Sequence, residues 1–361
     1  MDNLRNFKSD PTPITATLLP VRPVAKQRAM CIAQGEAATF DLFLLNDTSK
    51  AVSGTLSFSA VTPSGKLLKL GEFPSPTQTP DVFSYLVKEG FVTPKLTEEG
   101  MWRFKFAISS APLATQTKEI WATTASWPVL NGRPYEVGAS GLSPAVRRQL
   151  GKLGPFVAIQ DFKPGEKYDV IVSAGLVTGA ATTQNAGDTT GLEAQPGGAA
   201  RRVQQAGALA DGVIEAVRAG TPLLAIPQTD ALSEGVARQL AAAGAFTYNG
   251  AVGDLRAPWM GNWTFVRRHA LYEGLPVDQA MGIHYQARGR ESNGLLIDRA
   301  AGGAEVEIVA AYSRDHSRQI GAGTFTTRLG AGKIVYQRVP EMHPVMQQRF
   351  LANALRWLTR A

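Results

Sequence analysis

Cysteine and long apolar runs are what this sequence has least of. Its 361 residues include a single cysteine, Cys31, which excludes an intrachain disulfide and any metal site built from several cysteines. No run reaches the roughly 18 to 20 apolar residues that a membrane-spanning helix needs, and the start of the chain lacks the apolar core of a signal peptide. These absences predict a soluble protein without a membrane partner, and they leave its compartment unknown.

Charge is present in both signs but is not concentrated anywhere. Lysine and arginine number 37 and aspartate and glutamate 30, so the net charge is +7. The basic pairs are short and far apart, without the pattern of a recognition helix, a zinc finger or an aromatic-basic motif. The segment 321–326 contains a Gly-x-Gly pair but lacks the third glycine of a dinucleotide fingerprint. We therefore expect no nucleic acid partner, no metal and no other cofactor.

Residues 1–128 have the pattern of β-strands. Over Trp102–Phe106 every second residue is large and aromatic, and Arg103 and Lys105 lie between them. Because successive strand side chains point to opposite faces, this row predicts one buried face and one solvated face. Further rows of apolar and β-branched residues occupy 38–46 and 54–61. The pattern predicts an immunoglobulin-like β-sandwich, a fold that is more often a spacer or an interface than a catalytic site.

Residues 129–361 alternate strand and helix signals. The predicted strands are 168–175 and 222–226, and the predicted helices are 200–219, 231–243 and 343–360. The segment 176–198 has few large apolar side chains and is predicted to be a loop. Alternation of this kind is typical of a C-terminal α/β domain with a doubly wound, flavodoxin-like sheet.

One strand-to-helix turn in this region has the form of a catalytic turn without its nucleophile. Thr221–Asp230 resembles the nucleophile elbow of class I glutamine amidotransferases, which have a cysteine where this chain has Pro227. Proline carries no nucleophile, and its fixed φ does not suit a strained elbow. His343 resembles the partner histidine of those enzymes, but Val345 lies where they have a glutamate. The resemblance implies an amidotransferase-like domain with a degenerate site and no catalytic residue.

A second resemblance covers nearly the whole chain. Asp2–Pro11, Gly250–Trp263 and His269–Pro276 are similar to segments of the region that follows the catalytic barrel in glycoside hydrolase family 2, the β-galactosidase and β-glucuronidase group. This resemblance implies a non-catalytic accessory region of an O-glycosyl hydrolase. Its expected partners are the catalytic barrel of the parent polypeptide or further copies in a homo-oligomer, with an oligosaccharide as a candidate ligand.

The catalytic residues of such a parent enzyme are not expected in this chain. Retaining glycosidases use two carboxylates, and a barrel typically takes about 250 residues of regular strand-helix alternation, which is not found here. Four glutamates in the second region are instead expected to be surface or capping carboxylates: Glu136, Glu166, Glu234 and Glu273.

Two alternative functions remain open. A group of aromatic and polar residues combines flat faces with hydrogen-bond donors, as sugar recognition requires; it consists of Trp259, Asn262, Trp263, His284, Tyr285 and Arg288. These residues would make the chain a carbohydrate-binding module. The third hypothesis is an independent hydrolase with Ser173 as nucleophile, although Ser173 lacks the Gly-x-Ser-x-Gly surroundings of such enzymes.

Overall fold

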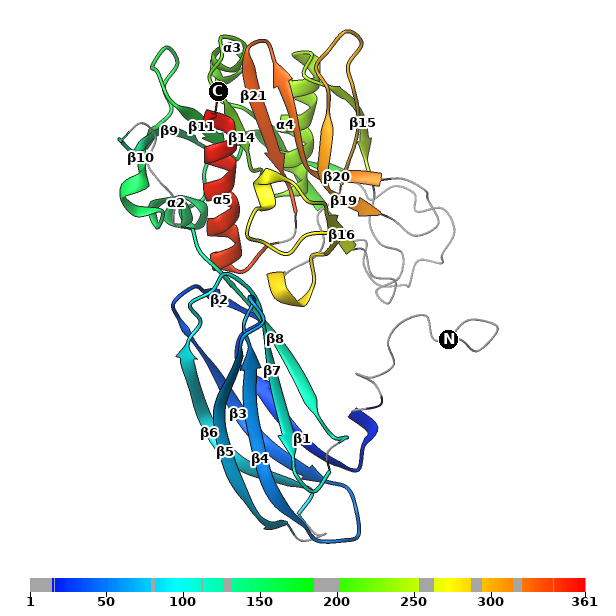
Figure 1. Cartoon of the computed structure of the whole chain (residues 1–361). Coiled ribbons are helices and arrows are strands. Elements are labelled where there is room, and N and C mark those ends of the chain that lie inside the picture. Colours follow the sequence, from blue (N-terminus) through cyan, green and yellow to red (C-terminus); the bar gives the residue numbers. More distant parts are fainter. Residues whose placement is uncertain are drawn as a thin grey trace. The chain divides into compact units, whose positions relative to one another are not determined.

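The structure is a computed structural model that describes residues 15, 17–78, 82–111, 113–125, 132–184, 202–252, 263–286, 294–313, 320–339 and 341–360. The chain divides into two compact units (Figure 1). The first comprises Met1–Thr124, Gly274–Pro276 and Ile283–Gln286, and the second comprises Ala125–Glu273, Val277–Gly282 and Ala287–Ala361. The boundary predicted after residue 128 lies outside the described residues.

The first unit is built from two sheets. Its smaller sheet is antiparallel, in the order β1 (Val21–Gln27), β3 (Ala37–Asn46) and β6 (Ser84–Lys95). Its larger sheet has the order β2 (Cys31–Ala33), β8 (Gln116–Thr123), β7 (Gly100–Ile108), β4 (Val52–Val61) and β5 (Leu67–Gln78). The pair β2–β8 is parallel and the other pairs are antiparallel.

Alternate side chains of these strands form one core between the two sheets. Phe40 of β3 contacts Phe104 of β7, with ring centroids 4.8 Å apart. Trp102, Phe104 and Phe106 are all buried, and the two basic residues between them are exposed, so the predicted division of this strand into two faces is confirmed. The indole nitrogen of Trp102 donates to a backbone carbonyl at 2.9 Å. Trp102 is therefore a core residue.

Among its described residues, the second unit has an eleven-stranded sheet that is parallel in one part and antiparallel in the other. One part is parallel, in the order β10 (Val157–Asp161), β9 (Tyr135–Ser140), β11 (Val170–Ser173), β14 (Leu223–Ala225) and β21 (Gly332–Gln337). The rest is antiparallel: β20 (Ile320–Leu329), β19 (Glu307–Ser313), β16 (Trp263–Val266) and β17 (Gln279–Ala280), with β18 (Leu295–Asp298) on β20 and β15 (Thr247–Ala251) on β18.

A separate hairpin and a few helices complete the described elements. The hairpin pairs β12 (Leu176–Gln184) with β13 (Arg202–Ala208). The helices are α2 (Pro144–Gly151), α3 (Val213–Arg218), α4 (Asp230–Ala242) and α5 (Pro344–Thr359). Single 3₁₀ turns are η1 (Gly154–Phe156) and η2 (Ala270–Tyr272) in this unit, and η3 (Ile283–Tyr285) in the first unit.

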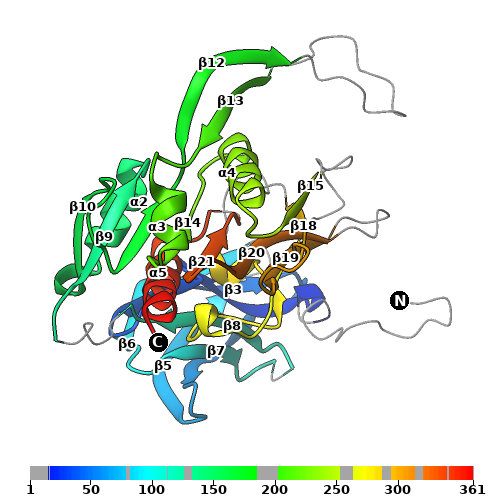
Figure 2. The ribbon, with the colours of Figure 1, turned by 90° about the horizontal axis from the view of Figure 1, so that it is seen from above.

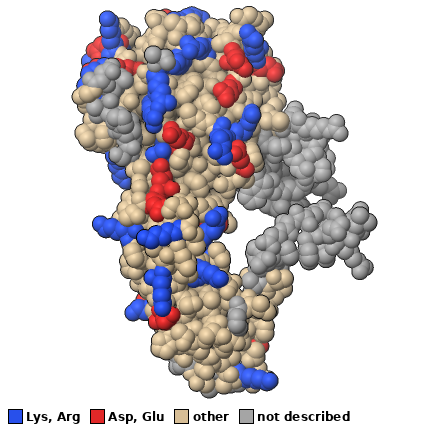
Figure 3. Space-filling view, in the orientation of Figure 1, with Lys and Arg blue, Asp and Glu red and all other residues tan. Residues whose placement is uncertain are grey.

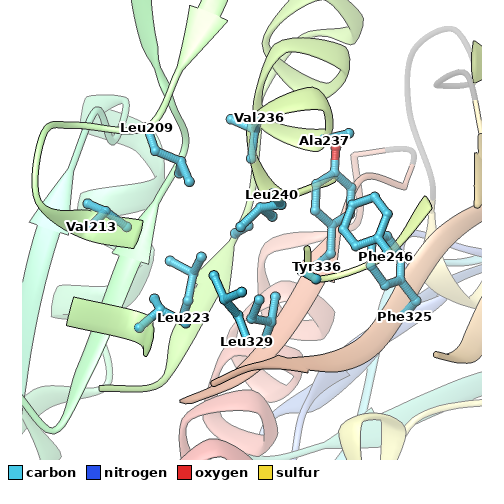
Figure 4. Packing of buried hydrophobic residues seen from close by; sticks show 14 of the residues in the cluster. Leu209, Val213, Leu223, Val236, Ala237, Leu240, Phe246, Phe325, Leu329 and Tyr336 are labelled. Carbon is cyan, nitrogen blue, oxygen red and sulfur yellow. The ribbon is translucent and has the colours of Figure 1, made fainter. Parts of the chain in front are cut away.

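The helices α4 and α5 pack on opposite faces of β21 (Figure 2). Successive strand side chains point to opposite faces, and Tyr336 hydrogen-bonds to Ser233 of α4 whereas Gln337 hydrogen-bonds to Gln347 of α5. On the α4 face the ring of Phe325 stacks on Tyr336 at 4.8 Å, within a core drawn from α3, α4 and the sheet (Figure 4).

The prediction of a doubly wound, flavodoxin-like C-terminal domain is wrong. Such a domain is mainly parallel strands joined by helices, whereas here β15 to β20 pair antiparallel and the described helices are few. The reason is that a short apolar run indicates a strand without indicating the direction of its neighbour. The strands at 170–173 and 223–225 and the helices at 230–242 and 344–359 were predicted within one or two residues.

Two other predictions in this unit fail because of the hairpin. The helix predicted over 200–219 is a strand, β13, followed by the short helix α3. The loop predicted over 176–198 begins with β12, and its later part lies outside the described residues. Pairing with β12 accounts for the strand at this position. A Cβ added to Gly207 would lie 2.6 Å from the Leu232 Cα, so β13 and α4 approach each other closely.

Candidate functional site

The turn after β14 has the chain course expected of an elbow but none of the strain. Ile226 continues the strand by donating its N–H to the Ser173 carbonyl at 2.8 Å. Pro227 follows and is buried, and it is not among the described residues with positive φ. Thr229 then caps α4, accepting a hydrogen bond from the Leu232 N–H at 3.2 Å. The turn is a relaxed strand-to-helix connection.

Beside this turn is a cavity of about 210 Å³. It lies where the parallel strands β14 and β21 end and where α2 and α5 begin, because the carboxyl ends of parallel strands meet at one edge of a sheet. Ile226, Pro227 and Val339 contribute apolar walls. The polar side chains of the lining are four amides, one guanidinium and one carboxylate: Gln149, Gln228, Gln337, Gln347, Arg338 and Glu341.

Gln337 is the most buried of these polar residues, with 5% of its surface exposed. Its Oε1 accepts a long hydrogen bond from Gln347 Nε2 at 3.4 Å, and its Nε2 is buried with no hydrogen-bond partner in the described part of the chain. Tyr272 lies near Gln337, but its hydroxyl is bonded to Thr324 Oγ1 at 2.9 Å and accepts no well-formed hydrogen bond from this amide. A buried donor left in this way costs about 1–3 kcal/mol.

Arg338 is the cation among the described lining residues, and it is already paired. Arg338 donates to Asp230 Oδ1 through Nη2 at 3.1 Å and through Nε at 3.3 Å. The Arg338 side chain is 18% exposed and that of Asp230 35%. Glu341 is exposed at the edge of the cavity. The lining is therefore rich in groups that both donate and accept hydrogen bonds, and it is close to neutral.

His343 serves as the N-cap of α5. Its Nδ1 accepts a hydrogen bond from the Val345 N–H at 3.4 Å, and Pro344 occupies the first turn of the helix. The capping role that histidine can play at a helix start accounts for this residue. His343 is not among the residues that line the cavity.

The aromatic group predicted to bind sugar is only partly described. Trp259, Asn262 and Arg288 lie outside the described residues, and Trp263 is placed only as the first residue of β16. His284 and Tyr285 form η3, which belongs to the first unit, whereas Trp263 belongs to the second. The proposed convergence of these side chains stays a prediction.

The two described side chains of that group are engaged within the first unit. Tyr285 is fully buried, and its hydroxyl donates to the Pro276 carbonyl. His284 Nε2 lies 3.5 Å from Glu119 Oε2, and its ring centroid lies 6.5 Å from that of Trp121. Burial lowers the pKa of His284, and Glu119 partly offsets that effect. Tyr285 thus offers no open face for stacking.

A larger hollow of about 740 Å³ lies along β1 and β8 in the first unit. Two glutamines of its lining join β1, an edge strand of the smaller sheet, to β8 of the larger sheet. Gln116 Oε1 accepts the Ala25 N–H at 2.7 Å, and Gln27 Nε2 donates to the Glu119 carbonyl at 2.8 Å. These bonds satisfy edge groups that an added strand would otherwise use.

The remaining candidate catalytic residues are occupied or buried. Ser173 is fully buried, and its Oγ accepts the Gly175 N–H at 3.2 Å. The four glutamates each lie in a surface contact, as expected: Glu136 with Arg133, Glu166 with Lys163 and Tyr168, Glu234 with Arg238, and Glu273 with Arg356.

Within the described ranges, no group of three or more His, Cys, Asp or Glu residues could hold a metal ion, and none of the helices there is long and apolar enough to cross a bilayer. On the face shown in Figure 3, Lys and Arg side chains lie among Asp and Glu side chains rather than in one patch.

Comparison with known proteins gives no family for the chain. No family model matches it, and no curated protein matches it. Solved structures with partial likeness include a β-galactosidase from Rahnella sp. R3, at 13% identity over 62% of this chain and 31% of that chain, with a TM-score of 0.34. A β-glucosidase from Listeria innocua matches at 11% identity over 28% of this chain and 16% of that one, with a TM-score of 0.19.

A CARDB domain from Pyrococcus furiosus matches at 16% identity over 28% of this chain and 92% of that chain, with a TM-score of 0.23. This chain therefore corresponds to less than a third of the β-galactosidase chain. Because all three TM-scores lie below 0.5, these similarities support no conclusion about function.

The cavity residues Gln149, Gln337, Arg338 and Gln347 were not singled out from the sequence. The sequence does contain a signal for Gln337. Side chains alternate along β21, so Gln337 points to the face of the sheet opposite to that of the buried Tyr336. The lining as a whole has no sequence signal, because it comes from three segments that are far apart in the chain: 145–149, 226–228 and 337–347.

Proposed function

We propose that this chain is a non-catalytic accessory region of a carbohydrate-active enzyme of the β-galactosidase type. The observation that carries the proposal is the cavity beside Pro227. Nucleophilic catalysis needs a nucleophile within hydrogen-bond reach of a base. Among the described residues, the lining of this cavity includes Pro227 at the turn and no serine, threonine, cysteine, lysine or histidine.

The state of His343 and Ser173 supports the same proposal. His343 uses Nδ1 to cap its own helix, and Ser173 is buried with its hydroxyl bonded to the backbone. Neither group is among the described residues that line the cavity. The carbohydrate part of the proposal rests on the sequence resemblance at Asp2–Pro11 and Gly250–Trp263.

An activity assay tests the proposal. The purified chain is incubated with nitrophenyl β-galactoside, nitrophenyl β-glucuronide and a short-chain nitrophenyl ester, and we expect no turnover above the buffer rate. The Ser173→Ala variant is the matched control, because turnover caused by a contaminant persists in it. Turnover that a substitution in this chain abolishes would show an independent enzyme and end the accessory proposal.

The alternative function, carbohydrate binding, is tested separately. If the region from Trp259 to Arg288 binds an oligosaccharide, Trp259→Ala and Trp263→Ala will lose that binding. The burial of Tyr285 leaves the two tryptophans as the stacking faces of this proposal. Unchanged or absent binding in both variants would dismiss it.

A further inference from the structure

We propose that the cavity beside Pro227 binds a small neutral polyhydroxylated ligand of about the size of one sugar ring. The cavity is about 210 Å³, which is below the roughly 300–1,000 Å³ of sites for drug-sized ligands. The inference rests on the proposed function in one respect, namely that the cavity binds its ligand without reacting with it.

Amide side chains dominate the polar part of the lining. Gln149, Gln228, Gln337 and Gln347 come from α2, the turn after β14, the end of β21 and α5. Each primary amide offers two N–H donors and a carbonyl acceptor. Hydroxyl groups also donate and accept hydrogen bonds. A polyol can therefore bond to several amides at once, as donor to a carbonyl oxygen or as acceptor from an N–H group.

Gln337 gives an independent indication that a ligand group belongs here. Only 5% of its surface is exposed, and its Nε2 has no hydrogen-bond partner among the residues that the structure describes. Among the described residues, its side chain forms a hydrogen bond with Gln347 at 3.4 Å, and the neighbouring Tyr272 hydroxyl is bonded to Thr324. An acceptor oxygen in the cavity, reached with a small rotation of this amide, would satisfy the donor that the fold leaves unpaired.

The charges of the lining favour a neutral ligand. A carboxylate or phosphate is usually held by an unpaired cation. Arg338 is bonded twice to Asp230, and the exposed Glu341 at the edge repels anions. The apolar walls of Ile226, Pro227 and Val339 fit the C–H face of a saturated ring, which complements the hydroxyl edge that the amides would bind.

Binding is tested by isothermal titration calorimetry and ligand-observed NMR with the whole chain. The neutral probes are D-galactose, D-glucose and myo-inositol, and the charged probe is D-galacturonate. We expect weak binding of at least one neutral probe and weaker or no binding of galacturonate. Absence of binding by every neutral probe, or preference for galacturonate, would overturn the inference.

Substitutions in the lining test whether the ligand binds in this cavity. Gln337→Leu and Gln347→Leu each remove one amide, and each is expected to weaken binding about fivefold to tenfold, the effect of one hydrogen bond. Gln160→Leu makes the same change at an exposed position on β10 and is expected to leave binding unchanged. Equal affinity in all three variants would overturn the inference.

A second variant, which fills the cavity, tests the proposal even if the Gln337 variant fails to fold. Ala145 is exposed in the first turn of α2 and lines the cavity, so Ala145→Phe fills the space without entering the core. We expect this variant to remain folded and to lose binding; full binding in it would contradict the proposal. Chemical conversion of a bound sugar would instead overturn the proposed non-catalytic role and leave the binding site standing.

Discussion

Asp169 illustrates how single charged residues stabilise the second unit. Arg133 donates to both of its oxygens, at 2.7 and 2.8 Å, and the Glu136 backbone N–H donates to Oδ2 at 2.8 Å. Burial alone raises the pKa of Asp169, but the hydrogen bonds outweigh burial and lower the pKa below its ordinary value of 3.8. The ionised carboxylate is thus favoured by folding.

This pKa shift predicts a pH-dependent stability. A carboxyl whose pKa is lower in the folded state contributes stability above its unfolded-state pKa and loses it as the pH falls through the folded-state pKa. Asp169→Asn should therefore lower the free energy of unfolding by about 1 kcal/mol at neutral pH, and the deficit should shrink in acid. Urea denaturation at neutral and acidic pH measures both values.

The control for Asp169 is Asp161→Asn, since Asp161 pairs with Arg147 at 2.7 Å but is 77% exposed. An exposed pair of this kind contributes little, so we expect a change below about 0.5 kcal/mol. A deficit in Asp169→Asn that is the same at neutral and acidic pH would contradict the assigned role.

His343 offers a second test at single-residue scale. As the N-cap of α5 it satisfies the Val345 N–H, and loss of a capping acceptor typically costs about 0.5–2 kcal/mol. His343→Ala should lower the free energy of unfolding by roughly that amount, as measured by urea denaturation. His343→Asn retains a capping acceptor and should recover most of the loss. Failure of asparagine to recover stability would argue that His343 has another role.

Residues whose role is local could be predicted from the sequence, whereas others could not. Pro227 is an example of the first kind, because a proline has no side-chain nucleophile in any fold. The unpartnered amide of Gln337 is an example of the second kind. It depends on the positions of Gln347 and Tyr272, which are brought to it only by tertiary packing.

At the scale of elements, the contact between β13 and α4 depends on two glycines. A Cβ added to Gly235 of α4 would lie 2.1 Å from the Gly207 carbonyl oxygen of β13. A backbone atom cannot yield as a flexible side chain can, so the helix and the hairpin must move apart to accommodate an added methyl group.

Gly235→Ala is therefore expected to destabilise the protein by about 2–4 kcal/mol. The matched control is Gly151→Ala, because Gly151 ends α2 and has no atom within 4 Å of an added Cβ. Alanine is the better helix former, so this change should be neutral or stabilising by up to about 1 kcal/mol. Thermal unfolding of both variants gives the comparison, and equal effects would contradict the close approach.

Elements with strong local periodicity were predicted well, and those defined by distant pairing were not. α5 shows the first case, since Pro344 starts it and its apolar residues repeat at helical spacing. β13 shows the second case. Its residues were predicted to be helical, but they pair with β12 and approach α4 closely at Gly207, and tertiary contacts of this kind override local propensity.

At the scale of the whole molecule, the sequence indicated a β-rich first part, and two sheets with a shared aromatic core make up the first unit. It did not indicate the mixed sheet of the second unit, because strand direction there is set by pairing between segments as distant as β14 and β21. The scattered charges of the face in Figure 3 agree with the lack of a basic cluster in the sequence.

The accessory role makes a prediction about the native polypeptide. If this chain supports a catalytic barrel, it is synthesised as part of a longer hydrolase whose catalytic glutamates lie outside these residues. The barrel alone typically adds about 250 residues. The predicted parent is therefore much larger than the 38.6 kDa of this chain, and glycosidase activity should accompany it.

The most direct test is the mass of the native protein in its source cells, determined by immunoblot with an antibody raised against this chain. The account predicts a band far above 38.6 kDa, with β-glycosidase activity in the material that the antibody precipitates. A band at 38.6 kDa, without associated glycosidase activity, would contradict the proposal that the chain is the accessory region of a larger enzyme.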